Sequence, residues 1–339
     1  VHPITQHYFG AAKELGLPVT PDCNGDEPEG ATTYRINTQN GRRCSSARAL
    51  LHPALNRPNL TLVKNVQVRR VLFDGLNATG VELANGQSFQ ASKEVILSAG
   101  AIGSPQILQL SGIGPGETLQ AAGIPVQIDN RNVGGNLQDH LAVSYTIRSR
   151  KPTLNATLGS LFGKVSAAMA YARARKGPLA LSVNQCGGFL RSSDHLSAPD
   201  QQLYFNPISY KSSVVHGKTK VRLDPFQAVS LCSQPARLTS RGRIDIQSAD
   251  PEQHPTIQPN SLSTNDDRLA AIAGIRLLQR LLETSSLQDL KTPGWEAELS
   301  SLESDAACLE DFQARASTVF HPTSTCRMGA AAETSVVDS

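Results

Sequence analysis

The stretch EVILSAGAIGSPQILQLSG, residues 94–112, limits what this chain can fold into more than any other part of its sequence. Its apolar, β-branched start predicts a buried strand, which leads directly into a turn that contains Gly100 and Gly103. Ser104 then predicts a helix N-cap, with Pro105 at the first helical position. A strand, a glycine turn and a helix start bring the backbone close to a ligand and direct helix N–H groups toward it.

The other periodic segments predict a mixed α/β protein. We expect helices at residues 3–15, 45–52, 160–176 and 263–283, and strands at 60–73, 80–90, 93–98, 203–210, 224–234 and 241–250. The Asn85-Gly86 pair is typical of a hairpin turn. Thr264 and Asp267 form a near-capping box at the start of the last helix. Its apolar face is expected to contain Leu269, Ile272, Ile275, Leu278 and Leu282. A nucleotide-type unit therefore comes first and a sheet-plus-helices unit second.

Length and charge exclude several function classes. A chain of 339 residues is long enough for two domains. The net charge of +3 is spread along the chain, so nothing indicates a nucleic-acid partner or a membrane-surface role. No apolar run approaches the roughly 18–20 residues that a membrane span needs.

The cysteines are widely spaced and contain no C-x-x-C pair, which argues against a disulfide scaffold and a closed zinc site. They are Cys23, Cys44, Cys186, Cys232, Cys308 and Cys326. Reduced thiols in a cytoplasmic protein are the simplest interpretation. The chain starts at Val1 and stops within an extended segment, so we expect a fragment of a longer protein.

His321 stands in a polar loop, STVFHPTSTCRMGA, residues 317–330. Pro322 disfavours helical geometry at this histidine. A metal site with Cys326 would need three or four ligands at close spacing, and a serine triad would need a nucleophile elbow, G-x-S-x-G, which is absent. A lone base serving a cofactor is the third alternative. From the residues alone, a surface or structural histidine is the commoner case.

The glycine turn is ambiguous in the same way. Gly100 and Gly103 can simply permit a tight strand-to-helix turn, which is the commoner role of such glycines. The dinucleotide fingerprint G-x-G-x-x-G does not occur in this sequence. If a dinucleotide binds through that fingerprint, the fingerprint precedes Val1.

Several segments, taken together and in order, resemble the glucose–methanol–choline (GMC) family of flavin-dependent oxidoreductases. They are GRRCSSARALLHPALNRPNLTLVKNVQVRRVLFDG, EVILSAGAIGSPQILQLSGIG, VGGNLQDHL, SRGRIDIQSADPEQHPTIQPNSLSTNDD and FHPTSTCRMG. The likeness covers nearly the whole chain. It implies an α/β fold in which an incomplete FAD-binding Rossmann-like domain accompanies an α+β substrate domain of antiparallel sheet and helices. The implied division is a FAD-binding portion at residues 1–145, a substrate-domain insertion at 146–235 and a truncated C-terminal domain at 236–339.

The resemblance implies FAD as cofactor and oxidation of a small-molecule alcohol to an aldehyde or ketone. It implies that the backbone of Val68 holds the adenine end, that Gly100 and Ala101 lie close to the cofactor, and that His321 is the active-site base. With an unperturbed pKa of about 6.5, histidine suits proton removal near neutral pH while the flavin takes the hydride. No metal is needed. Asp139 and His140 in NLQDH are expected to be structural residues near the flavin.

Substrate and electron acceptor stay open at this stage. Asn184, Gln185 and Tyr204 are candidate substrate contacts, although ordinary loop and sheet positions explain them equally well. The acceptor is oxygen or a quinone or dye-type compound, and we favour a dehydrogenase. Two alternatives remain: a FAD-containing hydroxynitrile-type lyase and an inactive fragment without flavin. The resemblance places the family's Gly-rich FAD loop before Val1, and its second active-site His or Asn beyond Ser339.

Overall fold

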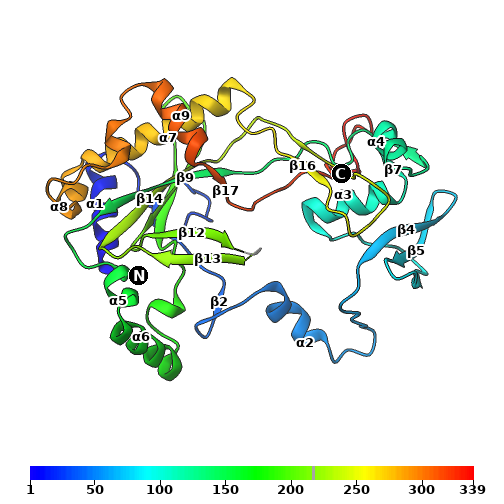
Figure 1. The fold of residues 1–339 in the computed structure, drawn as a ribbon, viewed down its shortest axis with the longest axis horizontal. Coiled ribbons are helices and arrows are strands. Elements are labelled where there is room, and N and C mark those ends of the chain that lie inside the picture. The colour runs from blue at the N-terminus through cyan, green and yellow to red at the C-terminus, as the bar shows by residue number, and fades with distance from the viewer. Residues whose placement is uncertain (216–217) are drawn as a thin grey trace. The chain divides into compact units, whose positions relative to one another are not determined.

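The computed structural model describes residues 1–215 and 218–339 and divides the chain into two compact units (Figure 1). Each unit combines three separate stretches of sequence. Unit 1 consists of Val1–Arg57, Leu141–Arg237 and Arg268–Ser317, and unit 2 of Pro58–His140, Leu238–Asp267 and Thr318–Ser339.

A six-stranded sheet with the order β1-β10-β11-β14-β9-β17 organises unit 1. Its first five strands pair antiparallel. The strands are β1 (Gly30–Thr33), β9 (Leu141–Arg148), β10 (Cys186–Leu190), β11 (Gln201–Asn206), β14 (Ala228–Pro235) and β17 (Ser317–Thr318). This sheet confirms the antiparallel sheet expected from the sequence.

The register gives the sheet one apolar face and one polar face, because side chains alternate along each strand. Val229 lies opposite Ile147, and Leu231 lies opposite both Tyr145 and Phe205, so one face carries the large apolar side chains. The ring of Tyr8 stacks on Phe205 at a centroid distance of 5.6 Å. Four helices supply buried residues to this core: α1 (Gln6–Glu14), α7 (Asn265–Glu283), α8 (Ser285–Leu290) and α9 (Asp305–Arg315).

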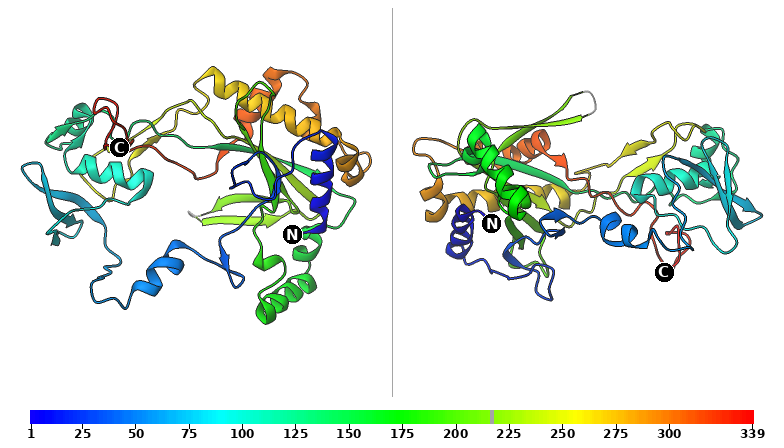
Figure 2. Two further views of the ribbon diagram at one scale, coloured as in Figure 1. Left: turned by 180° about the vertical axis from the view of Figure 1, so that it is seen from behind. Right: turned by 90° about the horizontal axis from the view of Figure 1, so that it is seen from below.

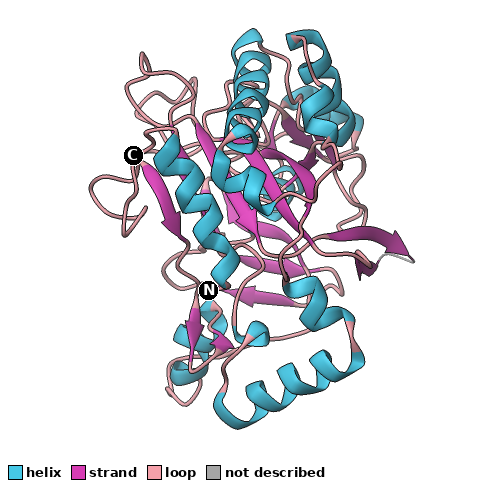
Figure 3. Cartoon of the chain, turned by 90° about the vertical axis from the view of Figure 1, so that its left-hand side faces the viewer, coloured by secondary structure: helices cyan, strands magenta, loops and turns pink. Residues whose placement is uncertain are grey.

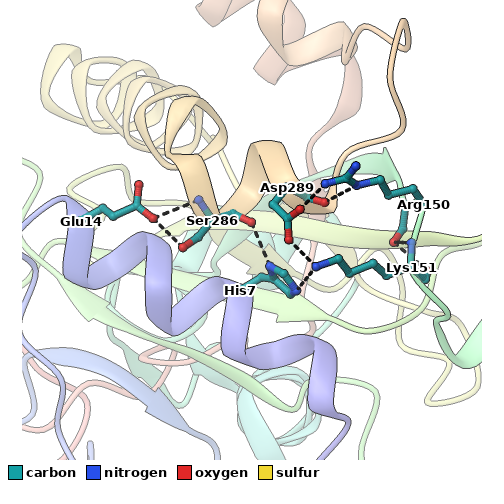
Figure 4. A network of polar contacts seen from close by, with 7 residues as sticks. His7, Glu14, Arg150, Lys151, Ser286 and Asp289 are labelled. Carbon is teal, nitrogen blue, oxygen red and sulfur yellow. Dashed lines mark hydrogen bonds and ion pairs between the residues drawn. The ribbon is translucent and has the colours of Figure 1, made fainter.

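Polar contacts join α1 to α8 and to the turn after β9 (Figure 4). The carboxylate of Glu14 accepts hydrogen bonds from the backbone N–H groups of Ser285 and Ser286, at 2.7 and 2.9 Å. Asp289 pairs with both Arg150 and Lys151. The bonds of Glu14 hold α1 beside α8, and the ion pairs of Asp289 hold α8 to the turn after β9.

The other elements of unit 1 are short helices and hairpins. They are η1 (Pro3–Thr5), β2 (Thr38–Gln39), β3 (Arg42–Arg43), η2 (Ala47–Leu51), α2 (His52–Ala54), α5 (Leu154–Gly159), α6 (Leu161–Ala174), η3 (Pro178–Ala180), β12 (Tyr210–Val215), β13 (Lys218–Leu223) and η4 (Glu298–Ser301). The hairpin β12–β13 projects from the unit (Figures 2 and 3), and α6 lies at the lower end of the view in Figure 3. α6 confirms the helix expected at 160–176.

Unit 2 is built around α3 (Gly100–Leu110), which packs against β4, β7 and β15. The unit also contains β4 (Val68–Asp74), β5 (Asn77–Leu83), β6 (Ser88–Gln90), β7 (Ile113–Gly114), α4 (Gly116–Ala121), β8 (Ile128–Asp129), β15 (Arg243–Asp245) and β16 (Thr256–Gln258). A small apolar cluster consists of Leu110, Leu119, Ala122, Ile124 and Ile246. The β5–β6 hairpin around Asn85-Gly86 is confirmed.

Gln109 ties α3 to the strand region around β15. Its amide nitrogen donates to the carbonyl of Ile244 at 2.9 Å, and its amide oxygen accepts from the N–H of Ile246 at 2.8 Å. The side chain is fully buried, so these bonds satisfy both ends of the amide in the core.

Several expectations from the sequence were wrong. Residues 93–98 form no strand, and Ile96 is 75% exposed, because no strand in the described part of the chain pairs with this segment. The strand predicted from residue 60 begins only at Val68. On α7, Leu269 is 55% exposed, so it lies outside the buried face that Ile275 and Leu278 form.

The start of α3 also differs from the prediction. The helix begins at Gly100, and Pro105 lies inside it instead of at its first position. Ser104 does not cap the helix as expected; its hydroxyl accepts a hydrogen bond from the N–H of Ala99 at 3.2 Å. A proline in the second turn is tolerated here because a side chain from elsewhere in the unit compensates for its missing N–H.

Candidate active site

His321 lies in a loop of unit 2 that is held along both of its sides by the segment 138–140. The N–H of Val319 donates to the carbonyl of His140 at 3.2 Å. Gln138 and Thr323 exchange two backbone hydrogen bonds, of 3.1 and 2.9 Å. The loop therefore projects residues 320–322 from a fixed base.

The imidazole of His321 has no hydrogen-bond partner among residues 1–215 and 218–339, and the residue is exposed. Its ring lies edge-on to the ring of His140, with 6.1 Å between centroids and 69° between planes. None of the serines and carboxylates that the structure describes holds the ring as in a hydrolase triad. Both ring nitrogens are therefore accessible to a ligand, as a proton acceptor requires.

Thr325 joins the His321 loop to the start of α3. Its hydroxyl donates to the carbonyl of Ala101 at 2.6 Å. In a regular helix that carbonyl would accept from the N–H four residues later, but residue 105 is a proline and has none. Thr325 is 1% exposed. Its buried hydroxyl therefore donates to the carbonyl of Ala101 the hydrogen bond that Pro105 cannot donate.

A cavity of about 650 Å³ lies where these two segments meet. It is lined by Leu97, Ser98, Gly100, Ala101, Ser104 and residues 322–328. Gly100 has a φ of +77°, a left-handed conformation that favours glycine, and α3 has no side-chain cap. The first N–H groups of any α-helix lack intrahelical partners, and here no cap side chain supplies one at the positive end of the helix dipole.

This set of donors fits a flavin, whose ring accepts hydrogen bonds at its carbonyl oxygens and ring nitrogens. Ser98, Gly100, Ala101 and Ser104 line the cavity and can offer backbone N–H groups and hydroxyls as donors, and the lining residues include no carboxylate. Gly100 and Ala101 thus lie beside the loop that carries His321. Pro322, the neighbour of His321, is the first lining residue on that loop.

Cys326 lines the same cavity, and burial raises the pKa of its thiol to about 11. The thiol is therefore protonated near neutral pH, which makes it a poor nucleophile and a poor metal ligand. The described residues contain no cluster of three or more His, Cys, Asp or Glu side chains that could hold a metal ion.

Val68 begins β4, an edge strand of the three-stranded sheet β4-β5-β6. It pairs with Leu83 on its inner side, so backbone groups on the outer side of this strand can bind a ligand. Val68 does not line the cavity beside Gly100. The contact predicted for Val68 is with the adenine end of FAD, and not with the part of the cofactor that Gly100 would contact.

The substrate candidates Asn184, Gln185 and Tyr204 all belong to unit 1. Asn184 is exposed. Gln185 is buried, and its amide oxygen accepts from the N–H of His2 at 2.7 Å. Tyr204 lies on the polar face of the sheet, where its hydroxyl donates to the amide oxygen of Gln234 at 3.1 Å.

Sequence reasoning missed Thr325 and the contacts of Asp139, whose carboxylate accepts from the N–H of His321 at 2.9 Å. Pro105 has no N–H, so its place in a helix that starts at Gly100 indicates that the carbonyl of Ala101 lacks its usual helical donor. The sequence does not say which side chain fills it, because Thr325 is 224 residues away.

Two family models, both described as GMC oxidoreductase, match residues 1–142 and 239–339. Mitochondrial choline dehydrogenase from Homo sapiens is 38% identical over 345 residues, covering 99% of this chain and 56% of the relative. Alcohol dehydrogenase [acceptor] from Pseudomonas putida is 34% identical over 97% of this chain and 59% of the relative.

Among solved structures, a formate oxidase from Aspergillus oryzae RIB40, studied for its FAD modification, has a TM-score of 0.85 and 26% identity. The match covers 99% of this chain and 62% of that one. This chain spans less than two thirds of the length of these relatives. Two matching models, together with the shared fold along the whole chain, show that it belongs to the GMC oxidoreductase family.

Proposed function

We propose that this chain is part of an FAD-dependent enzyme that oxidises the CH–OH group of a small alcohol, with His321 taking the hydroxyl proton. The observation that carries the proposal is the joining of the His321 loop to the uncapped start of α3 through Thr325 and Ala101. This contact puts a histidine with free ring nitrogens on the loop that borders the candidate flavin cavity.

FAD, when bound, would accept the hydride from the carbinol carbon. The N–H groups at the start of α3 would hold an acceptor group of the flavin, and the backbone of Val68 its adenine end. A neutral imidazole at His321 would accept the hydroxyl proton on a ring nitrogen. Negative charge on the alcohol oxygen then makes loss of the hydride easier. Cys326 stays a neutral thiol and takes no proton in this scheme.

The substrate is a small alcohol, and the names of the relatives support that class. We favour a dehydrogenase similar to choline dehydrogenase, with a quinone or dye-type acceptor; oxygen is the alternative acceptor. Asn184, Gln185 and Tyr204 stay the predicted substrate contacts. A cytoplasmic location stays a prediction; none of the described helices has the length and apolar character of a membrane span.

The test uses the flavin-loaded full-length protein, mixed anaerobically with a panel of alcohols while flavin absorbance is followed. At least one alcohol should bleach the flavin, and His321→Ala should slow that step by about 10²–10⁴-fold, the usual worth of a positioned acid–base group. His254→Ala, which removes an exposed histidine of the same unit, is the matched control and should leave the rate unchanged.

An unchanged rate in His321→Ala would remove this residue from the mechanism. Flavin that stays oxidised while a cyanohydrin is cleaved would instead support the lyase alternative. Full-length protein that never carries flavin would contradict the whole proposal.

A further inference from the structure

We infer that Asp139 is a positioning residue for His321, acting through the backbone of the loop and not through the imidazole. The inference rests on the proposed function, because it matters for catalysis only if His321 is the base. It assigns a task to a side chain that the sequence marked only as structural.

The carboxylate of Asp139 binds the loop at two points. Its Oδ1 accepts a hydrogen bond from the backbone N–H of His321 at 2.9 Å, and its Oδ2 accepts from the hydroxyl of Thr318. The oxygen of Thr318 accepts in turn from the N–H of Phe320 at 2.9 Å. One carboxylate and one hydroxyl thus satisfy the N–H groups of two consecutive residues.

These bonds oppose strain in the loop. Phe320 has a φ of +62° and Ser324 a φ of +75°, both in the left-handed region that side chains other than glycine disfavour. Such conformations persist only where the surroundings impose them. The side chain of Phe320 is 82% exposed, so packing does not impose it. Hydrogen bonds from Phe320 to Thr318 and from His321 to Asp139 bind the backbone at the strained position, while the backbone bonds of Val319 and Thr323 hold the two sides of the loop.

Among the described residues, the ring nitrogens of His321 have no hydrogen-bond partner, and this has a functional reason. A base that must receive a proton keeps a ring nitrogen free, and the described residues leave both nitrogens of His321 without a partner. Its position must then come from the main chain. Hydrogen bonds to an ionised acceptor are about twice as strong as neutral ones, which suits Asp139 to this task.

The kinetic test compares Asp139→Ala and Asp139→Asn with Asp129→Ala in the flavin-loaded full-length protein. Asp129 is the matched control, since its carboxylate also accepts a backbone N–H of the same unit, that of Gly116, at 2.9 Å. Asp139→Ala should lower kcat for flavin reduction by about 10²-fold, the cost of misplacing a reacting group by about 1 Å, with little change in KM. Asp139→Asn should recover part of the loss, because its amide oxygen can still accept from the N–H of His321.

A second readout needs no flavin. Amide hydrogen exchange of Phe320 and His321 should be faster in Asp139→Ala than in the parent chain, and unchanged in Asp129→Ala. If Asp139→Ala does not fold, Thr318→Val carries the same two measurements. It keeps the shape of the side chain and removes the hydroxyl that holds Phe320.

A wild-type rate of flavin reduction in Asp139→Ala, or an equal loss in Asp129→Ala, would overturn the inference. Slow reduction in His321→Ala with a normal rate in Asp139→Ala would defeat this inference alone. Normal rates in both variants would defeat the proposed function as well.

Discussion

At the scale of single residues, Pro105 explains why the hydroxyl of Thr325 binds the carbonyl of Ala101. A proline inside α3 leaves the carbonyl of Ala101 without its helical partner, and the buried hydroxyl of Thr325 donates to it. The same bond fixes the loop that carries His321. The carbonyl that lacks its helical partner in α3 is thus the point at which the loop of His321 is bound to the helix.

Removing this hydroxyl should therefore destabilise the protein. We expect Thr325→Val to lower the free energy of unfolding by about 1–3 kcal/mol, since it leaves the half-buried carbonyl of Ala101 without this hydrogen bond. Thr325→Ser keeps the hydroxyl and should lose less. Urea unfolding followed by circular dichroism measures both, and equal stability of the Val variant and the parent would contradict this account.

At the scale of elements, the sequence predicted helices better than strands. The helix of residues 263–283 is confirmed as Asn265–Glu283, because caps and 3.6-residue periodicity are local signals. The apolar run at 93–98 predicted a buried strand, yet no described strand pairs with it. A strand depends on partners from elsewhere in the chain, so its sequence alone does not establish it.

Asp267, in the first turn of α7, binds both the N-cap residue of its own helix and the backbone of a distant segment. Its N–H donates to the hydroxyl of Thr264, as the capping box predicted. Its carboxylate accepts from the N–H groups of Thr239 and Ser240, at 2.6 and 3.0 Å. Burial by itself would raise the pKa of this carboxyl, but these hydrogen bonds outweigh it and hold the pKa below the ordinary value of 3.8.

A pH dependence of stability follows. Because the folded pKa is the lower one, the carboxylate stabilises the fold above pH 3.8 and loses this contribution as the pH falls through the folded pKa. Asp267→Asn should be less stable than the parent at pH 7, and the difference should shrink toward pH 3. Urea unfolding between pH 3 and pH 7 measures the difference in stability between the two proteins. A difference that stays constant with pH would show that the ionised carboxylate of Asp267 does not contribute as proposed.

At the scale of the whole molecule, each unit has its own apolar core, and each collects segments that are distant in the sequence. The single tryptophan, Trp295, belongs to unit 1. Gly134 belongs to unit 2, where it has a φ of +78° and where an added Cβ would overlap the carbonyl oxygen of Ile244. The fluorescence of Trp295 therefore reports on unit 1, whereas a substitution at Gly134 perturbs unit 2.

We expect Gly134→Ala to destabilise unit 2 by at least about 2 kcal/mol, through strain and overlap together. Denaturant unfolding followed by circular dichroism should then gain an earlier transition, while the fluorescence of Trp295 keeps its midpoint. Gly123→Ala is the matched control, because Gly123 has a φ of +73° but open space around an added Cβ, and it should cost less. A single transition that shifts equally in both probes would show that the units unfold together.

The sequence by itself determined the mixed α/β class, most of the helices, the hairpin at Asn85-Gly86 and the segments that resemble the GMC family. These depend on turn chemistry, periodicity and short motifs, all of which act over a few residues. Only the tertiary structure decided that Ala101 meets Thr325 and that Asp139 holds His321, across 224 and 182 residues. Hydrogen bonds between distant segments depend on the path of the whole chain, so no local pattern specifies them.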